Sequence, residues 1–162
     1  YELCYRRISD KNIEGLDLSS WRLAFNGAEP VTPDAITNFC ERFKAYGFRQ
    51  EAMAPVYGLA ESSVGLAFPP LGRKPLIDRI ERDIFVRSGK AVPVVDTEMP
   101  ALEFVACGQP LPGHQIKIVD RTGRDINIKV VPQYPLLVEW LYRHQRCSIP
   151  RRNVITSSAT GV

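Results

Sequence analysis

The sequence predicts an α/β fold in which at least one helix packs on a layered sheet. Residues 21–26 alternate in the period of two that is typical of a strand. Residues 32–47 follow with the periodicity and end signals of an amphipathic helix. Further strand-like runs occur at 102–108 and 115–120. This strand–loop–helix order, in a chain of 162 residues, favours one layered α/β domain.

The first strand is expected after a short N-terminal helix, which ends near residue 9, and a turn over 13–20. Trp21, Leu23 and Phe25 would share one face of this strand, with Arg22 and Ala24 on the other. Asn26 and Gly27 supply the backbone flexibility at which the strand is expected to end.

The clearest helix is expected to begin beside Thr32 as its N-cap, with Pro33 in the first turn and Asp34 at the positive end of the helix dipole. An apolar stripe at i, i+3, i+4 and i+7 predicts the buried face, and Gly47 is placed to stop the helix. The stripe consists of Ile36, Phe39, Cys40 and Phe43.

The remaining segments have weaker patterns. Residues 52–70 contain two short apolar runs that flank a loop, and residues 69–100, rich in proline and charge, are expected to be irregular. A short helix is expected near 78–86, with the charged run 77–83 as its solvated face. The strands at 102–108 and 115–120 are expected to precede a turn at 121–125.

Composition excludes several classes of protein. Apolar residues make up 44% and charged residues 24%, which are ordinary values for a globular domain. No apolar run is long enough to span a bilayer, and the start YELCYRR resembles neither a signal peptide nor an initiation site. Four scattered cysteines without CxxC spacing predict reduced cytoplasmic thiols. His114 and His144 are isolated, and neither is expected to be a base or a metal ligand.

The net charge of +3 is unevenly distributed. Residues 128–162 contain five basic side chains and one acidic one, so the preceding residues are nearly balanced. A domain that binds nucleic acid would show a stripe of basic residues. Because the residues before 128 have nearly balanced charge, we expect no nucleic-acid partner.

Two segments, NGAEP at 26–30 and YGLAE at 57–61, have the residue types of a nucleotide site. Ligands of open α/β sheets bind at the carboxyl ends of strands, and small residues let a flat ligand approach the backbone. An aromatic ring, a glycine and a carboxylate could pack on a base, admit a phosphate and bind magnesium. The alternative remains open that Gly27 is a turn glycine, Glu29 a solvated charge and Tyr57 a core aromatic.

The order of several segments resembles the fatty acyl-AMP ligases, a branch of the adenylate-forming enzymes that include acyl-CoA synthetases. The likeness covers about residues 1–125. It rests on GLDLSSWRLAFNGAEPV, YGF, YGLAES and VACGQPLPGHQIKIVD, in the order of the family. It implies that residues 1–125 are an incomplete part of the family's large N-terminal AMP-binding domain. Gly108 and Gly113 would be conformational requirements.

The resemblance implies a role for each motif residue. Gly27, Ala28 and Glu29 would line the adenine pocket with their backbone. Tyr57 would pack on the base and Gly58 would keep the pocket floor open. Ala60 stands where many relatives have Thr, so it could contact phosphate only through its N–H, and Glu61 would bind Mg²⁺. The ATP-binding set is Asn26, Gly27, Ala28, Glu29, Tyr57, Gly58, Leu59, Ala60 and Glu61.

The implied activity is that of an acid–thiol ligase. A fatty acid and ATP would give acyl-AMP, and the acyl group would pass to the thiol of an acyl carrier protein, on its own or in a polyketide synthase, or to coenzyme A. The family's phosphate loop, its Thr-Gly-Asp segment and its catalytic Lys are not found here, so this chain alone is expected to be inactive. A non-catalytic nucleotide- or acyl-binding module and a pseudogene remnant are the alternatives.

Residues 126–162 do not match the family pattern, which has an Arg-Gly-Pro turn followed by Thr-Gly-Asp. We predict that a frameshift produced this tail, a divergent but genuine C-terminus being the alternative. Sequencing the parent DNA and translating its other two frames tests this. One frame should restore both motifs, and the hypothesis is wrong if neither does.

Overall fold

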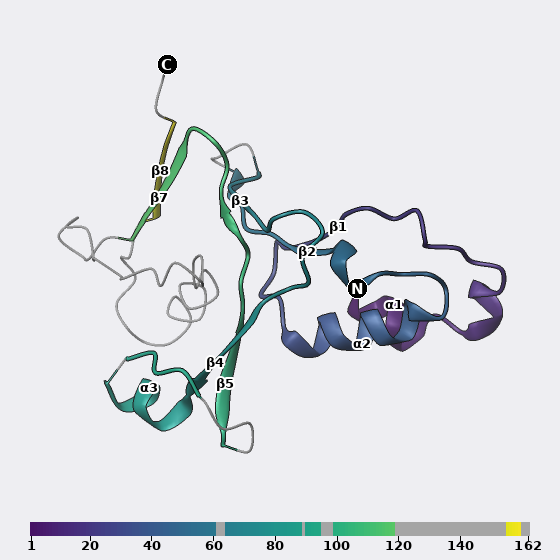
Figure 1. Ribbon diagram of the computed structural model, residues 1–162, viewed down its shortest axis with the longest axis horizontal. Helices are drawn as coiled ribbons and strands as arrows, with labels where there is room; N and C mark the ends of the chain where they lie inside the picture. Colours follow the sequence, from purple (N-terminus) through teal and green to yellow (C-terminus); the bar gives the residue numbers. More distant parts are fainter. Residues whose placement is uncertain (61–63, 89, 95–98, 119–154, 160–162) are drawn as a thin grey trace.

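Four two-stranded sheets and three α-helices form the described part of the chain, which comprises residues 1–60, 64–88, 90–94, 99–118 and 155–159 of this computed structural model (Figure 1). The helices are α1 (Glu2–Arg7), α2 (Pro33–Lys44) and α3 (Arg82–Ser88), and the 3-10 turns are η1 (Asp10–Ile13) and η2 (Gln50–Ala52). The strands are β1 (Ala24–Asn26), β2 (Met53–Pro55), β3 (Ala67–Phe68), β4 (Ile77–Glu81), β5 (Ala101–Val105), β6 (Gln109–Pro110), β7 (His114–Ile118) and β8 (Ile155–Ala159).

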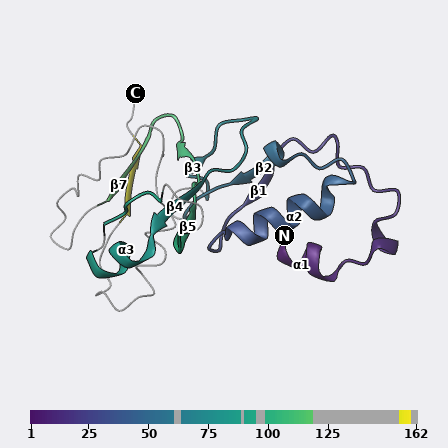
Figure 2. The ribbon, with the colours of Figure 1, turned by 60° about the horizontal axis from the view of Figure 1, so that its bottom comes forward.

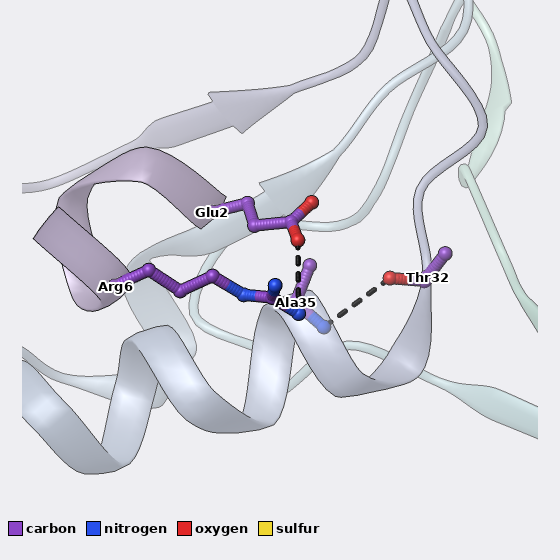
Figure 3. Close-up of polar contacts among 4 residues, drawn as sticks. All are labelled: Glu2, Arg6, Thr32 and Ala35. Carbon is purple, nitrogen blue, oxygen red and sulfur yellow. Dashed lines mark hydrogen bonds and ion pairs between the residues drawn. The ribbon is translucent and has the colours of Figure 1, made fainter.

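Helix α2 has the ends that the sequence predicts. The backbone N–H of Ala35 donates to Oγ1 of Thr32 over 3.3 Å (Figure 3), so Thr32 is the N-cap. Pro33 opens the first turn. At the other end, Phe48 N–H donates to Phe43 O and Gly47 N–H to Lys44 O, the bond pattern of a Schellman motif. Gly47 has a φ of +83°, which a glycine adopts at little cost.

The apolar stripe of α2 is the centre of the main core. Its four predicted residues are all buried, and they pack with Ala24 of β1 and with Ala52 and Met53 of η2 and β2. Helix α1 lies along α2 in both ribbon views (Figures 1 and 2). Its Glu2–Arg6 ion pair is exposed (Figure 3), so its contribution to stability is small.

The first strand is shorter than predicted, because it begins at Ala24 and not at Trp21. The N–H of Trp21 donates to Leu18 O in a turn, and the indole packs edge-on against Phe39 and Phe48, on the α2 side. Phe25 faces the other side of the sheet. The expectation that Trp21 and Phe25 share a face is therefore wrong, because the turn rotates Trp21 toward the helix.

The expectation of a helix over 78–86 is half wrong. Residues 77–81 form β4, which pairs antiparallel with β5, and the helix begins only at Arg82. Ile80 is fully buried, and Arg79 lies opposite Glu103 with 3.2 Å between Nε and Oε1. Cross-strand partners from residues 101–105 stabilise the strand there.

The later strands agree with prediction in place and differ at their ends. Strands β5 and β7 span residues 101–105 and 114–118, where strands were expected at 102–108 and 115–120. Gly108 and Gly113, between the two strands, have φ values of +92° and +78°. The conformational requirement expected of both glycines is thereby confirmed.

The turn expected at 121–125 and most of the tail, His144 included, lie outside the described residues. None of the helices in the described ranges has the length and apolar character to cross a membrane.

The N-cap of α2 gives a direct test of this core. Replacing Thr32 by Ala removes the acceptor for the Ala35 N–H and should lower the free energy of unfolding by about 1 kcal/mol. Urea denaturation followed by circular dichroism measures the change. Thr37→Ala, at an exposed position within the same helix, is the matched control and should leave stability equal or slightly higher. Equal effects of the two substitutions would contradict the assignment of the cap.

Candidate functional site

The two predicted loops start side by side, at the carboxyl ends of neighbouring parallel strands. Strand β1 pairs parallel with β2, and Asn26 lies opposite Pro55. The N–H of Val56 donates to Asn26 O over 2.9 Å. This hydrogen bond joins β1 and β2 at the point where both strands end, and Figure 2 shows the two strands side by side. Residues 26–30 and 57–60 therefore leave the same edge of the sheet, as a shared site requires.

The first loop is tight because of Gly27. A Cβ built on Gly27 would lie 2.8 Å from the carbonyl oxygen of Val56, closer than real Cβ contacts. Gly27 thus lets the two strand ends approach each other. Ala28 has a φ of +68°, and both Ala28 and Glu29 are exposed to solvent.

Tyr57 is largely a core residue. It is 8% exposed and packs with Leu66, Ala67 and Cys107. Its backbone N–H donates to Ala67 O, and its carbonyl oxygen accepts from the Ala67 N–H. This packing agrees with the alternative in which Tyr57 is an aromatic residue of the core. Because so little of Tyr57 is exposed, a full stack on a base would require this cluster to rearrange.

Gly58 lies against protein backbone. A Cβ at Gly58 would overlap the carbonyl oxygen of Val64, and the Val64 N–H donates to Leu59 O over 2.9 Å. The loop is therefore closed on itself, with Ala60 exposed between the two ends. Glu61, the expected magnesium ligand, lies outside the described residues.

Backbone strain marks both loops. In the described residues, Ala28 at +68° and Val64 at +72° are the non-glycine residues with positive φ. A β-branched residue in this region is a genuine outlier, and strained residues gather at ligand sites and switches. Sequence reasoning missed Val64, since no residue-type signal predicts a valine in a left-handed conformation.

A second feature that the sequence did not reveal is the contact between Tyr1 and β1. The Tyr1 hydroxyl donates to the carbonyl oxygen of Phe25 over 2.6 Å, and its ring packs edge-on against Phe39. Burial, with a smaller effect of Cys4, raises the pKa of Tyr1 to about 12, so the donor keeps its proton. This hydrogen bond holds the backbone of β1 at Phe25, one residue before Asn26 and the first loop.

No metal cluster is present in the described ranges, where three His, Cys, Asp or Glu side chains do not meet in one place. Magnesium is commonly held by one or two carboxylates together with phosphate oxygens of a substrate. A single carboxylate next to the two loops would therefore be sufficient for a nucleotide-bound ion.

Comparisons with known proteins place the chain among fatty-acid ligases. It is 36% identical to the medium-chain-fatty-acid–[acyl-carrier-protein] ligase JamA of Moorena producens over 121 residues, 74% of this chain and 20% of JamA. It is 36% identical to the corresponding ligase TtuA of Teredinibacter turnerae, over 76% of this chain and 19% of TtuA. The chain thus spans about a fifth of these relatives.

A solved structure agrees with this likeness. The fatty acyl-adenylate ligase of L. pneumophila in complex with acyl adenylate and pyrophosphate superimposes with a TM-score of 0.68 at 35% identity, over 75% of this chain and 21% of that one. No family model matches the chain.

The close approach at Gly58 predicts a large effect of one methyl group. Gly58→Ala should lower the free energy of unfolding by about 2 kcal/mol or more, because the new Cβ overlaps the Val64 carbonyl. Gly72→Ala is the control: its φ is +70° but its Cβ would meet nothing within 4 Å, so only the backbone strain of about 1 kcal/mol applies. Thermal and urea unfolding compare the two. Equal losses would show that residues 58 and 64 do not approach as described.

Proposed function

This chain belongs to the fatty acyl-AMP ligase family over about three quarters of its length, and we propose that it supplies one side of an acyl-adenylate site. The observation that supports the proposal most is the pairing of Asn26 with Pro55, from which both loops leave one sheet edge. Relatives named as fatty-acid ligases, one of them solved with acyl adenylate and pyrophosphate, support the choice of ligand.

The first loop is proposed to bind the adenosine. Its exposed residues 28 and 29 present backbone groups beyond the end of β1, where a base could accept and donate hydrogen bonds. Asn26 and Gly27 set the position of this backbone through their contacts with Val56. Tyr57 is largely buried, so the base would meet only the small exposed part of this residue.

The second loop is proposed to serve the phosphates. Gly58, Leu59 and Ala60 would place backbone N–H groups near the α-phosphate, and Ala60, without a hydroxyl, could contribute only its N–H. Glu61 would bind the Mg²⁺ that neutralises phosphate charge. Such neutralisation matters here, because an anionic carboxylate must attack an anionic phosphate.

The proposed reaction has two steps. A fatty-acid carboxylate oxygen forms a bond to the α-phosphorus of ATP, the bond to the bridging oxygen breaks, and pyrophosphate leaves with that electron pair. A thiolate then attacks the acyl carbon and expels AMP. By analogy with JamA and TtuA, the thiol would belong to an acyl carrier protein, with a polyketide synthase carrier or coenzyme A as alternatives. ATP supply favours the cytoplasm for this chemistry.

Residues 1–125 are proposed as the partial AMP-binding domain and 126–162 as a frameshifted or divergent tail. Activation requires several preorganised groups at once, and the two loops supply only some of them. The proposed state of this chain is therefore a nucleotide-binding segment without catalysis of its own. A remnant with no binding is the competing possibility.

Calorimetric titration of the purified chain with ATP and Mg²⁺, followed by an ATP–pyrophosphate exchange assay, tests the proposal. We expect heat of binding without exchange. Exchange would show a working enzyme, and the absence of both would favour the remnant.

The same titration tests Glu61. Glu61→Gln should weaken Mg²⁺-dependent ATP binding roughly tenfold, as expected when a charged metal ligand is lost, and leave AMP binding unchanged. Glu14→Gln, at an exposed position before β1, is the control and should change neither. Equal ATP affinity of wild type and Glu61→Gln would exclude Glu61 as the magnesium ligand.

A further inference from the structure

The first loop of the candidate site is held mainly at its two ends. Among the described residues, none forms a hydrogen bond with residues 27–31. At the far end, Val31 is 7% exposed and packs in the main core. At the near end, the loop continues from Asn26, the last residue of β1. Whatever fixes the end of β1 therefore fixes the point from which this loop starts.

Two donors hold the end of β1, one for each of its last two carbonyl groups. The Val56 N–H donates to Asn26 O over 2.9 Å. The Tyr1 hydroxyl donates to Phe25 O over 2.6 Å. Because each peptide group is planar, these bonds fix two successive planes, and the second plane ends at Gly27. The hydroxyl of Tyr1 thus acts one peptide plane before the loop.

The position of the Tyr1 hydroxyl is set by contacts with the core and with α1. The ring packs edge-on against Phe39 of α2, with 4.9 Å between ring centroids, and Phe39 is 3% exposed. The Tyr1 carbonyl oxygen accepts from the backbone N–H groups of Cys4 and Tyr5. Burial, and to a smaller extent Cys4, raises the pKa of Tyr1 to about 12, so the hydroxyl can donate at neutral pH. Tyr1 is therefore a donor held in place for Phe25 O.

We propose that Tyr1 is a positioning residue for the nucleotide, an inference that rests on the proposed function. Its hydroxyl acts through Phe25 O and takes no part in contacts with the adenosine. With the 25–26 peptide fixed, the backbone of residues 28 and 29 stays where the base is proposed to meet it. Without the hydroxyl, the end of β1 takes up other positions and only a fraction of molecules present the loop correctly. The apparent affinity falls in proportion to that fraction.

A role for Tyr1 in stability alone makes a different prediction. If the hydroxyl only supplies a partner for a carbonyl group, its loss lowers the free energy of unfolding and leaves the nucleotide affinity of the folded chain unchanged. The contact with the core is made by the ring, which packs on Phe39. Tyr1→Phe keeps this ring and removes the hydroxyl, so one substitution separates the two roles.

Calorimetric titration of the full 162-residue chain with AMP compares wild type with Tyr1→Phe. An ordinary hydrogen bond shifts an equilibrium by roughly three- to tenfold, so AMP binding should weaken by that factor. NMR of the ligand-free chain gives a readout that does not depend on binding. The resonances of the Phe25 carbonyl carbon and the Asn26 amide nitrogen should shift. The backbone order parameters of residues 27–29 should fall, because the loop loses one of its supports.

Two matched variants separate positioning from more general effects. Tyr5→Phe also removes a hydroxyl from a tyrosine that packs against the main core. Gly72→Ala, between β3 and β4, lowers stability through backbone strain at a φ of +70°. Both variants should bind AMP as wild type does and should leave the order parameters of residues 27–29 unchanged. Circular dichroism checks that each variant folds.

The outcomes distinguish this inference from the proposed function. Wild-type AMP affinity in Tyr1→Phe would overturn the inference, whether or not the Phe25 resonance shifts, and would leave the nucleotide proposal intact. An equal loss of affinity in Gly72→Ala would also overturn it, because lower stability would then account for the effect. Failure of wild type to bind AMP would overturn the proposed function together with this inference, and the wild-type titration alone identifies that result.

Discussion

The parallel pairing of two three-residue strands is the constraint on which the site depends. Parallel neighbours cannot be joined by a tight turn, so the chain must cross over between them, and α2 is that crossover. Its buried stripe packs on Ala24 and Met53, one from each strand, and so holds both strands against one helix. Both carboxyl ends then meet at one edge, and the hydrogen bond from Val56 to Asn26 locks them there. The loops are adjacent because the helix between them is amphipathic.

This dependence explains which parts of the fold were predictable. The N-cap and the buried face of helix α2 could be predicted to the residue, because its cap and its stripe are local signals that agree with each other. Its last helical residue, Lys44, precedes the predicted stop at Gly47 by one turn. The strand at 77–81 could not, because a mixed charged and apolar run suits a helix equally well until Glu103 and Phe104 are placed opposite it. The position of the two motifs at strand ends followed from the sequence. The burial of Tyr57 did not, because it depends on Leu66 and Ala67, which lie about ten residues further along the chain.

The glycines of the two motifs have a structural reason that precedes any ligand. Gly27 accommodates the carbonyl of Val56, and Gly58 accommodates that of Val64. Each glycine therefore shapes a loop by letting main chain approach main chain. A ligand that binds such loops meets backbone already held in place, including the strained Ala28 and Val64, so little ordering would remain to be done on binding.

The hydroxyl of Tyr1 has a consequence for association between chains. Successive carbonyls of a strand point to opposite edges; Asn26 O is used by β2, so Phe25 O faces the outer edge, where Tyr1 occupies it. An incoming strand would have to displace this short hydrogen bond of 2.6 Å before it could extend the sheet at this position. Within the described residues, where β2 is the strand that pairs with β1, the Tyr1 side chain thus occupies a backbone acceptor at the other edge of β1. Such an occupied acceptor limits edge-to-edge pairing without a charge or a proline.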